Sequence, residues 1–149
     1  KYKRLVPGGT VRLKGSYIVE YVSHETDDNG NVKEIRVRAI EDSKSGGVNA
    51  NIKVKGVIQW VNAKDAVDLT LNEYDYLLLD GEGDFSLRLN KGSHKTFAAK
   101  GEAMLGSVEE YSRFQFVRMG YYSAVKGYGD NRREFNMIVG LKDSYNAKK

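Results

Sequence analysis

The sequence lacks cysteine altogether, and it has only one proline and two histidines in 149 residues. Without cysteine it has no disulfides and no thiolate metal ligands, which fits a reducing compartment such as the cytoplasm. The histidines, His24 and His94, belong to no H-x-x-x-H pair, so no metal site is predicted. A chain of this length buries about two-thirds of its unfolded surface on folding, and its core is therefore large enough to be stable without disulfide bonds.

Long apolar runs and catalytic motifs are absent as well. No stretch approaches the roughly 20 apolar residues of a membrane-spanning helix, so no membrane partner is expected. The chain starts with Lys1 rather than Met and shows no signal peptide, and we therefore expect that it begins inside a longer protein or was processed. There is no Walker-type phosphate loop, and Gly81 and Gly83 do not open a helix after a strand. These residues alone are expected to bind rather than catalyse, and to hold no cofactor.

The residues that are abundant favour β-structure. Sixteen glycines and ten tyrosines are typical of a chain with many strands and turns. Residues 32–40 alternate apolar with polar side chains, and the turn-forming stretch 27–31 separates them from the apolar-rich stretch 17–24, which predicts a hairpin. That turn lacks the oxygen spacing and closing Glu of a calcium loop, so calcium binding is not expected.

Further alternating segments extend this pattern through the chain. Residues 42–52 are expected to form a flexible loop, 85–89 a strand or a turn of helix, and 102–108 an irregular or helical piece. Many short strands at regular spacing are typical of barrels or sandwiches. The composition changes at 81–84, which predicts two domains, 1–83 and 84–149. The other expected strands are 11–14, 53–61, 67–74, 94–99, 113–118, 121–125 and 134–141.

Charge is unevenly distributed, although the net charge is only +4. The first fourteen residues hold five basic side chains and no acidic one, in two clusters joined by a Pro-Gly-Gly turn. Arg12 and Lys14 alternate with Val11 and Leu13, so two cations should share the exposed face of a strand. This suits an anionic partner, although a merely solvated strand explains it equally well. Residues 65–84 contain seven acids and no Lys or Arg, and should not face a polyanion.

Single-stranded RNA is bound by basic grooves whose aromatic and amide side chains capture unstacked bases. Near the C-terminus, Arg113 and Gln115 are expected on one strand face, with Arg118 on the other. An amide between bulky apolar neighbours is suited to reading a base edge, but it is as often only solvent-facing. The N-terminal set of this type is Tyr2, Lys3, Arg4, Arg12 and Lys14.

Several motifs resemble the C-terminal, anticodon-binding region of the glutaminyl-tRNA synthetases. They are Tyr-Lys-Arg-Leu-Val at 2–6, Val-Arg-Leu at 11–13, Lys-Val-Lys-Gly-Val-Ile-Gln-Trp-Val at 53–61 and Phe-Gln-Phe at 114–116 followed by Arg118. They run in the family's order from residue 1 to about 145. The resemblance implies an all-β fold of two antiparallel β-barrels of the ribosomal protein L25 type. It makes 1–83 the distal barrel and 84–149 the C-terminal part of an incomplete proximal barrel.

The resemblance also assigns roles to individual residues. The implied contacts to the anticodon are Lys3, Arg4 and Arg118 to the third base, Arg12 and Lys14 around the first, and Gln115 to the central uridine. The sequence departs from the family at Val117 and Val125, where an acidic residue is common. Valine accepts no hydrogen bond from a base, so recognition of the second and third bases is expected to be built differently here.

The implied partners are the anticodon loop of tRNA(Gln) and an upstream catalytic domain in the same chain. The parent would be a monomeric, cytoplasmic glutamine–tRNA ligase that uses ATP and Mg²⁺ in its catalytic domain. Alternatives are the archaeal/eukaryotic type of glutamyl-tRNA synthetase, a non-enzymatic rRNA-binding barrel of the L25 type, and a β-rich module for protein or sugar. The motif at 53–61 argues against the last two.

Overall fold

The computed structural model describes residues 3–129 and 131–141, so the predicted RNA-binding residue Tyr2 lies outside the described part. The chain forms two compact units, Lys1–Trp60 and Val61–Lys149. The division falls between Trp60 and Val61, not near residue 83 as the composition indicates. The reason is that residues 67–74 form a strand in the sheet of the second unit.

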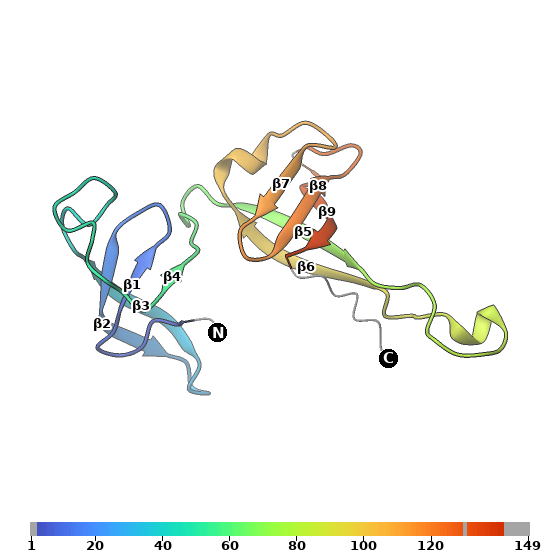
Figure 1. Cartoon of the computed structure of the whole chain (residues 1–149), viewed down its shortest axis with the longest axis horizontal. Helices are drawn as coiled ribbons and strands as arrows, with labels where there is room; N and C mark the ends of the chain where they lie inside the picture. The colour runs from blue at the N-terminus through green and yellow to red at the C-terminus, as the bar shows by residue number, and fades with distance from the viewer. Residues whose placement is uncertain (1–2, 130, 142–149) are drawn as a thin grey trace. The chain divides into compact units, whose positions relative to one another are not determined.

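The first unit is a four-stranded sheet (Figure 1). Its order is β3-β2-β1-β4, and β1 runs antiparallel to β2 but parallel to β4. The predicted strand at 53–61 is therefore reduced to a two-residue β4, because only Val57 and Ile58 pair with β1. The strands are β1 (Thr10–Leu13), β2 (Ile18–Thr26), β3 (Val32–Ala39) and β4 (Val57–Ile58).

The predicted hairpin is confirmed as β2 and β3. Its turn is stabilised by Asp27, whose Oδ1 accepts hydrogen bonds from the backbone N–H groups of Asn29 and Asn31 at 3.0 and 2.8 Å. A hydrogen bond from the Asn31 side chain, and then these two backbone bonds, lower the pKa of the Asp27 carboxyl. Gly30 takes a φ of 80°, which a glycine adopts without steric cost. Turn chemistry in the sequence thus sets the register of the hairpin.

The buried residues of the first unit come mainly from β1 and β2. Val11, Ile18 and Val19 are buried, whereas every residue of the edge strand β3 is exposed. The alternation in β3 therefore does not mark a buried face in this unit. The side chain of Ser43 is completely buried, and its Oγ accepts from the N–H of Ile18 at 2.8 Å and donates to the carbonyl of Ile40 at 2.6 Å.

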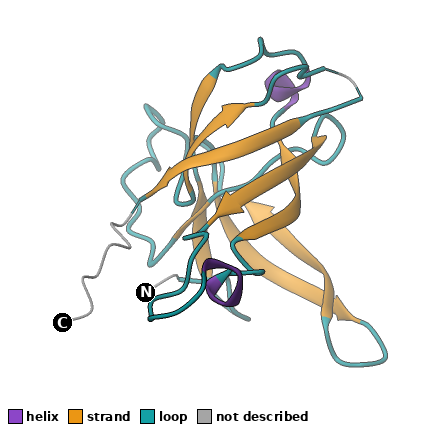
Figure 2. Cartoon of the chain, turned by 90° about the vertical axis from the view of Figure 1, so that its right-hand side faces the viewer, coloured by secondary structure: helices purple, strands orange, loops and turns teal. Residues whose placement is uncertain are grey.

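The second unit is a five-stranded sheet with the order β6-β5-β9-β8-β7. Its neighbours are antiparallel except for the parallel pair β5 and β9. Figure 2 shows how strands predominate, with two short helical turns, η1 (Phe85–Arg88) and η2 (Ala103–Gly106). The strands are β5 (Val67–Tyr74), β6 (His94–Gly101), β7 (Arg113–Phe116), β8 (Gly120–Ala124) and β9 (Glu134–Gly140).

The all-β class is therefore confirmed, with two corrections to the architecture. Among the described residues neither sheet closes on itself, which is consistent with incomplete barrels. Each sheet also includes one parallel pair, so the strands are not purely antiparallel. No helix in the described part is long and apolar enough to cross a membrane.

Aromatic side chains fill the core of the second unit. Tyr122 and Phe135 are completely buried, and the ring of Phe116 stacks on Tyr122 with centroids 4.7 Å apart. Phe114 and Phe116 also meet Phe135 edge-on, an arrangement that aromatic quadrupoles favour. Burial, together with the neighbouring Glu73 carboxylate, raises the pKa of Tyr122 to about 12. Because Phe114 and Phe116 face this core, the residue between them faces outward.

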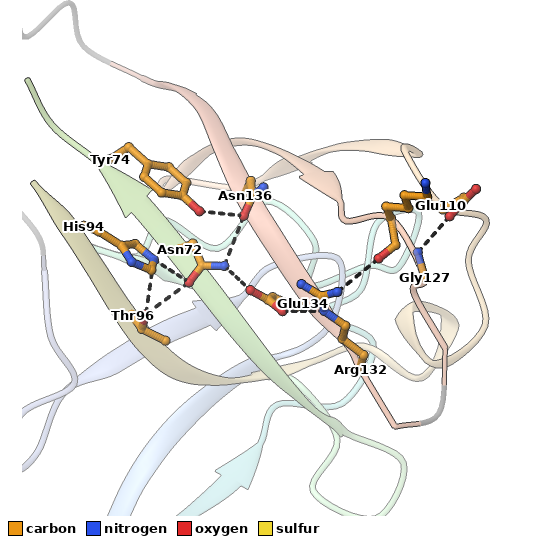
Figure 3. Close-up of polar contacts among 10 residues, drawn as sticks. Asn72, Tyr74, His94, Thr96, Glu110, Gly127, Arg132, Glu134 and Asn136 are labelled. Atoms are coloured by element: carbon orange, nitrogen blue, oxygen red, sulfur yellow. Dashed lines mark hydrogen bonds and ion pairs between the residues drawn. The ribbon is translucent and has the colours of Figure 1, made fainter. Parts of the chain in front are cut away.

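A hydrogen-bonded polar network crosses β6, β5 and β9 (Figure 3). At its centre is Asn72, which is only 2% exposed. Its amide nitrogen donates to Glu134 at 2.5 Å and to Asn136 at 3.0 Å, and its amide oxygen lies 3.0 Å from Nε2 of His94. Every buried side-chain polar atom in the described residues has a partner. The network therefore satisfies a buried polar group and ties together strands that are distant in the sequence.

This network predicts an acid-dependent contribution to stability. Hydrogen bonds from Arg132 and then Asn72 hold the pKa of the Glu134 carboxyl below its ordinary value of 4.5. The stabilisation is thus present above about pH 4.5 and is lost as the pH falls through the lowered pKa. We expect Glu134→Gln to be less stable than wild type at pH 7 and indistinguishable at acid pH in urea denaturation. Glu82→Gln, at an exposed loop position, should follow wild type throughout; a constant deficit in Glu134→Gln would contradict the prediction.

Candidate nucleic-acid interface

A tight turn positions the N-terminal cations. The N–H of Gly9 donates to the carbonyl of Val6 at 2.8 Å, and Gly8 between them has a φ of 69°. Proline at the second position and a left-handed glycine at the third are the signature of a type II turn. Gly9 is then fixed to β2, because its carbonyl accepts the N–H of Tyr21 at 3.0 Å. The turn thus directs residues 3–6 back along the sheet.

Because Gly56 has no Cβ, Lys3, which precedes the turn, can pack closely against the segment that precedes β4. A Cβ at Gly56 would lie 2.9 Å from both Cβ and the carbonyl oxygen of Lys3, closer than real Cβ contacts allow. The carbonyl of Gly56 accepts the N–H of Arg12 at 2.9 Å, which fixes the segment to β1. Lys3 is therefore held beside residues 53–56, although fifty residues separate them in the sequence.

These segments enclose an open groove with a volume of about 980 Å³. Four of the described residues that line it are cationic and none is acidic: the cations are Lys3, Arg4, Lys53 and Lys55. Lys53 and Lys55 are not among the predicted site residues. The sequence does carry a signal for them, because the two lysines flank Val54 in the same alternation of basic and apolar residues as Arg12 and Lys14 around Leu13.

Arg12 does not line this groove, and its guanidinium is occupied by the protein itself. Nη1 donates to the carbonyl of Ser43 at 2.6 Å and Nη2 to the carbonyl of Ala50 at 2.7 Å. The loop at 42–51 is closed further by the N–H of Asn49, which donates to the carbonyl of Asp42 at 3.0 Å. This loop is thus hydrogen-bonded to the sheet rather than open, and the guanidinium of Arg12 makes side-chain hydrogen bonds that hold it there.

Lys14 follows directly after β1 and is exposed. Its N–H donates to the carbonyl of Ile58 at 2.9 Å, and its carbonyl accepts Nε1–H of Trp60 at 3.1 Å. Its backbone is thus fixed by the residues around β4. The structure leaves its ammonium group accessible, as the prediction for this position requires.

Gln115 belongs to β7 in the second unit, where it lies opposite Tyr121 on β8. Arg113 and Gln115 are exposed, whereas Phe114 and Phe116 are half-buried, so the predicted alternation of this strand is confirmed. In the described part of the chain the side chain of Gln115 makes no hydrogen bond with the protein. Its amide is therefore free to pair with a ligand.

Arg118 lies in the turn between β7 and β8 and has a φ of 67°. The N–H of Met119 donates to the carbonyl of Phe116 at 2.8 Å, which closes the turn. A left-handed backbone is uncommon for arginine and costs energy that a glycine would avoid. The turn takes Arg118 out of the alternation of β7 and places it, exposed, at the tip of the hairpin.

The histidines serve structural contacts. His24 Nδ1 lies 2.6 Å from the hydroxyl of Tyr21, and His94 stacks on the ring of Tyr74 and bonds Asn72. Among the described residues no group of His, Asp and Glu has the arrangement to hold a metal ion.

An all-β fold, a groove lined by cations and an outward-facing amide on a strand are together typical of nucleic-acid-binding proteins. Comparison with known families defines the class further. Residues 57–125 match the family model of the anticodon-binding domain of class I tRNA synthetases for glutamate and glutamine. Over these residues, slightly less than half of its length, the chain is similar to this anticodon-binding family.

Within that family the relatives are glutamine–tRNA ligases. The chain is 38% identical to those of Polynucleobacter asymbioticus and Ralstonia pickettii, over 93% and 97% of its length. It is 39% identical to that of Bordetella pertussis over 99% of its length. The chain spans about a quarter of the length of these relatives, 25% to 26%. These relatives favour the glutamine type over the glutamate type, the rRNA-binding barrel and the protein- or sugar-binding module.

The contacts of Arg12 generate a prediction about the 42–51 loop. Arg12→Ala removes two charge-assisted hydrogen bonds and leaves the carbonyls of Ser43 and Ala50 without them, at a cost of about 1.5–3 kcal/mol. We expect a lower free energy of unfolding in urea and faster amide exchange within 42–51.

Arg38→Ala is the matched control for this prediction. Arg38 bonds Glu20 at 2.8 Å on the exposed strand β3, and such surface pairs contribute about 0–1 kcal/mol. Equal destabilisation of the Arg12→Ala and Arg38→Ala variants would show that the hydrogen bonds of Arg12 do not specifically stabilise the 42–51 loop. Arg12→Lys should recover only part of the loss, because an ammonium cannot donate in the forked geometry.

Proposed function

We propose that this chain binds the anticodon loop of tRNA(Gln) and reads its bases as part of a glutamine–tRNA ligase. The observation that carries the proposal is the groove lined by the cations Lys3, Arg4, Lys53 and Lys55, in a chain that matches glutamine–tRNA ligases along nearly its whole length. In this proposal the two units correspond to the two anticodon-binding barrels of the family.

The proposed mechanism is the readout of an unstacked loop. Lys3, Arg4 and Lys14 offer exposed cationic groups in the first unit, and Gln115 and Arg118 offer an amide and a guanidinium in the second. Gln115 discriminates the central base, because an amide both donates to and accepts from a base edge. Arg12 contributes mainly by fixing the 42–51 loop, since both of its Nη groups are already engaged.

The parent protein would join glutamine to tRNA(Gln) in the cytoplasm. ATP and Mg²⁺ would act in its upstream catalytic domain, and this chain would hold neither. We propose a monomeric parent, in which anticodon binding selects the tRNA that the catalytic domain aminoacylates.

The direct test is the binding of labelled anticodon stem-loops, measured by fluorescence anisotropy. We expect the loop with anticodon YUG to bind more tightly than YUC, and both more tightly than a scrambled loop. A well-placed bidentate contact discriminates between bases by about 1–3 kcal/mol. Equal affinity for all three loops would overturn the proposal.

Gln115→Ala tests the reading of the central base. Because the amide is the discriminating group, the variant should lose the preference for uridine at that position and keep its fold, since Gln115 is exposed. Arg113→Ala, two positions away on the same strand face, is the control and should weaken all loops evenly. Retained uridine preference in Gln115→Ala would remove this residue from the site.

A further inference from the structure

The basic groove of the first unit contains two lysines that are not among the predicted site residues. Lys53 and Lys55 line it together with Lys3 and Arg4. Both are exposed, and Gly56 fixes their segment against Lys3. The four cations therefore belong to one surface, to which residues near the beginning and near the end of the unit's sequence contribute.

Within the described residues these four cations have no carboxylate partner, unlike several other basic residues of the chain. Elsewhere in the described chain Arg36, Arg38, Lys100 and Arg132 form ion pairs with carboxylates. Across the described residues no ion pair or side-chain hydrogen bond involves Lys3, Arg4, Lys53 or Lys55. Like charges gathered around a groove without counter-charges repel one another and raise its potential. An anionic ligand relieves that repulsion.

The chemistry of lysine indicates which part of the ligand is bound. An ammonium is a compact point charge without the planar fork that reads a base edge in register. It is suited to phosphate oxygens, which give affinity and position but carry no sequence information. The groove also contains backbone of the Pro7–Gly8–Gly9 turn, where glycines leave room for a sugar–phosphate chain to approach.

We propose that Lys53 and Lys55 bind the RNA backbone, contacting two phosphates next to the nucleotide that Lys3 and Arg4 contact. The inference rests on the proposed function, which it deepens by separating the groove into a base-contacting side and a phosphate-binding side. Lys53 and Lys55 supply affinity and orientation, whereas discrimination among anticodons stays with the other residues.

The test is the salt dependence of binding, measured with the whole chain and the labelled YUG and scrambled stem-loops at several KCl concentrations. Each phosphate neutralised on a single strand contributes about 0.7 to the slope of log K against log salt concentration. The double variant Lys53→Ala/Lys55→Ala should therefore lower the magnitude of the slope by about 1.4. It should weaken both loops by the same factor, so that the YUG preference is unchanged.

Two control variants separate charge from fold. Lys53→Arg/Lys55→Arg retains both charges and should keep the wild-type slope. Lys33→Ala/Lys95→Ala removes the same charge from exposed strand positions outside the groove and should also keep it. Urea denaturation of each variant shows whether the fold is intact.

The outcomes distinguish this inference from the proposed function. If wild type prefers YUG and the Lys53→Ala/Lys55→Ala slope matches wild type, the phosphate-binding role is wrong while anticodon recognition stands. If wild type binds both loops equally, anticodon recognition fails, and the slope of the variant still decides whether these lysines bind RNA backbone. A loss of YUG preference in the double variant would also overturn the inference, because it would make these lysines base-reading.

Discussion

The parallel pairing of β1 with β4 is the constraint on which the candidate interface of the first unit depends. Arg12 is at its centre: its N–H bonds the carbonyl of Gly56, and its guanidinium bonds two carbonyls of the 42–51 loop. Because Gly56 has no Cβ, Lys3 can lie against it. One residue thus holds both the loop and the segment that carries Lys53 and Lys55.

In the second unit the candidate binding residue Gln115 is positioned by the packing of aromatic side chains. Its aromatic core fixes the rings of Phe114 and Phe116 inward against Tyr122 and Phe135. Strand alternation then leaves Gln115 no position except the outer face. The polar network around Asn72 joins β5, β6 and β9, so the sheet that carries β7 and β8 is supported by strands that are remote in sequence. Rigid scaffolds of this kind present a reading side chain at little entropic cost.

Several expectations from the sequence failed for physical reasons that particular residues show. The strand expected at 53–61 is mostly not paired, because the N-terminal segment lies against Gly56 and leaves only Val57 and Ile58 beside β1. The apolar alternation of β3 faces no core, because every residue of this edge strand is exposed and neither of its faces is covered. The domain boundary moves from about residue 83 to Trp60, because β5 pairs with β9 more than sixty positions later. Long-range pairings of this kind leave no local signal in composition.

Local patterns in the sequence are sufficient for the all-β class, the β2–β3 hairpin with its Asp27 turn, the outward position of Gln115 and the resemblance to an anticodon-binding family. These follow from local patterns: alternation, turn residues and short motifs. The folded chain is needed to see that Lys53 and Lys55 join Lys3 and Arg4 around one groove, and that Arg12 is engaged with the 42–51 loop. The reason is that those relations depend on backbone pairing and on a close approach at a glycine, which bring together residues that local patterns treat separately.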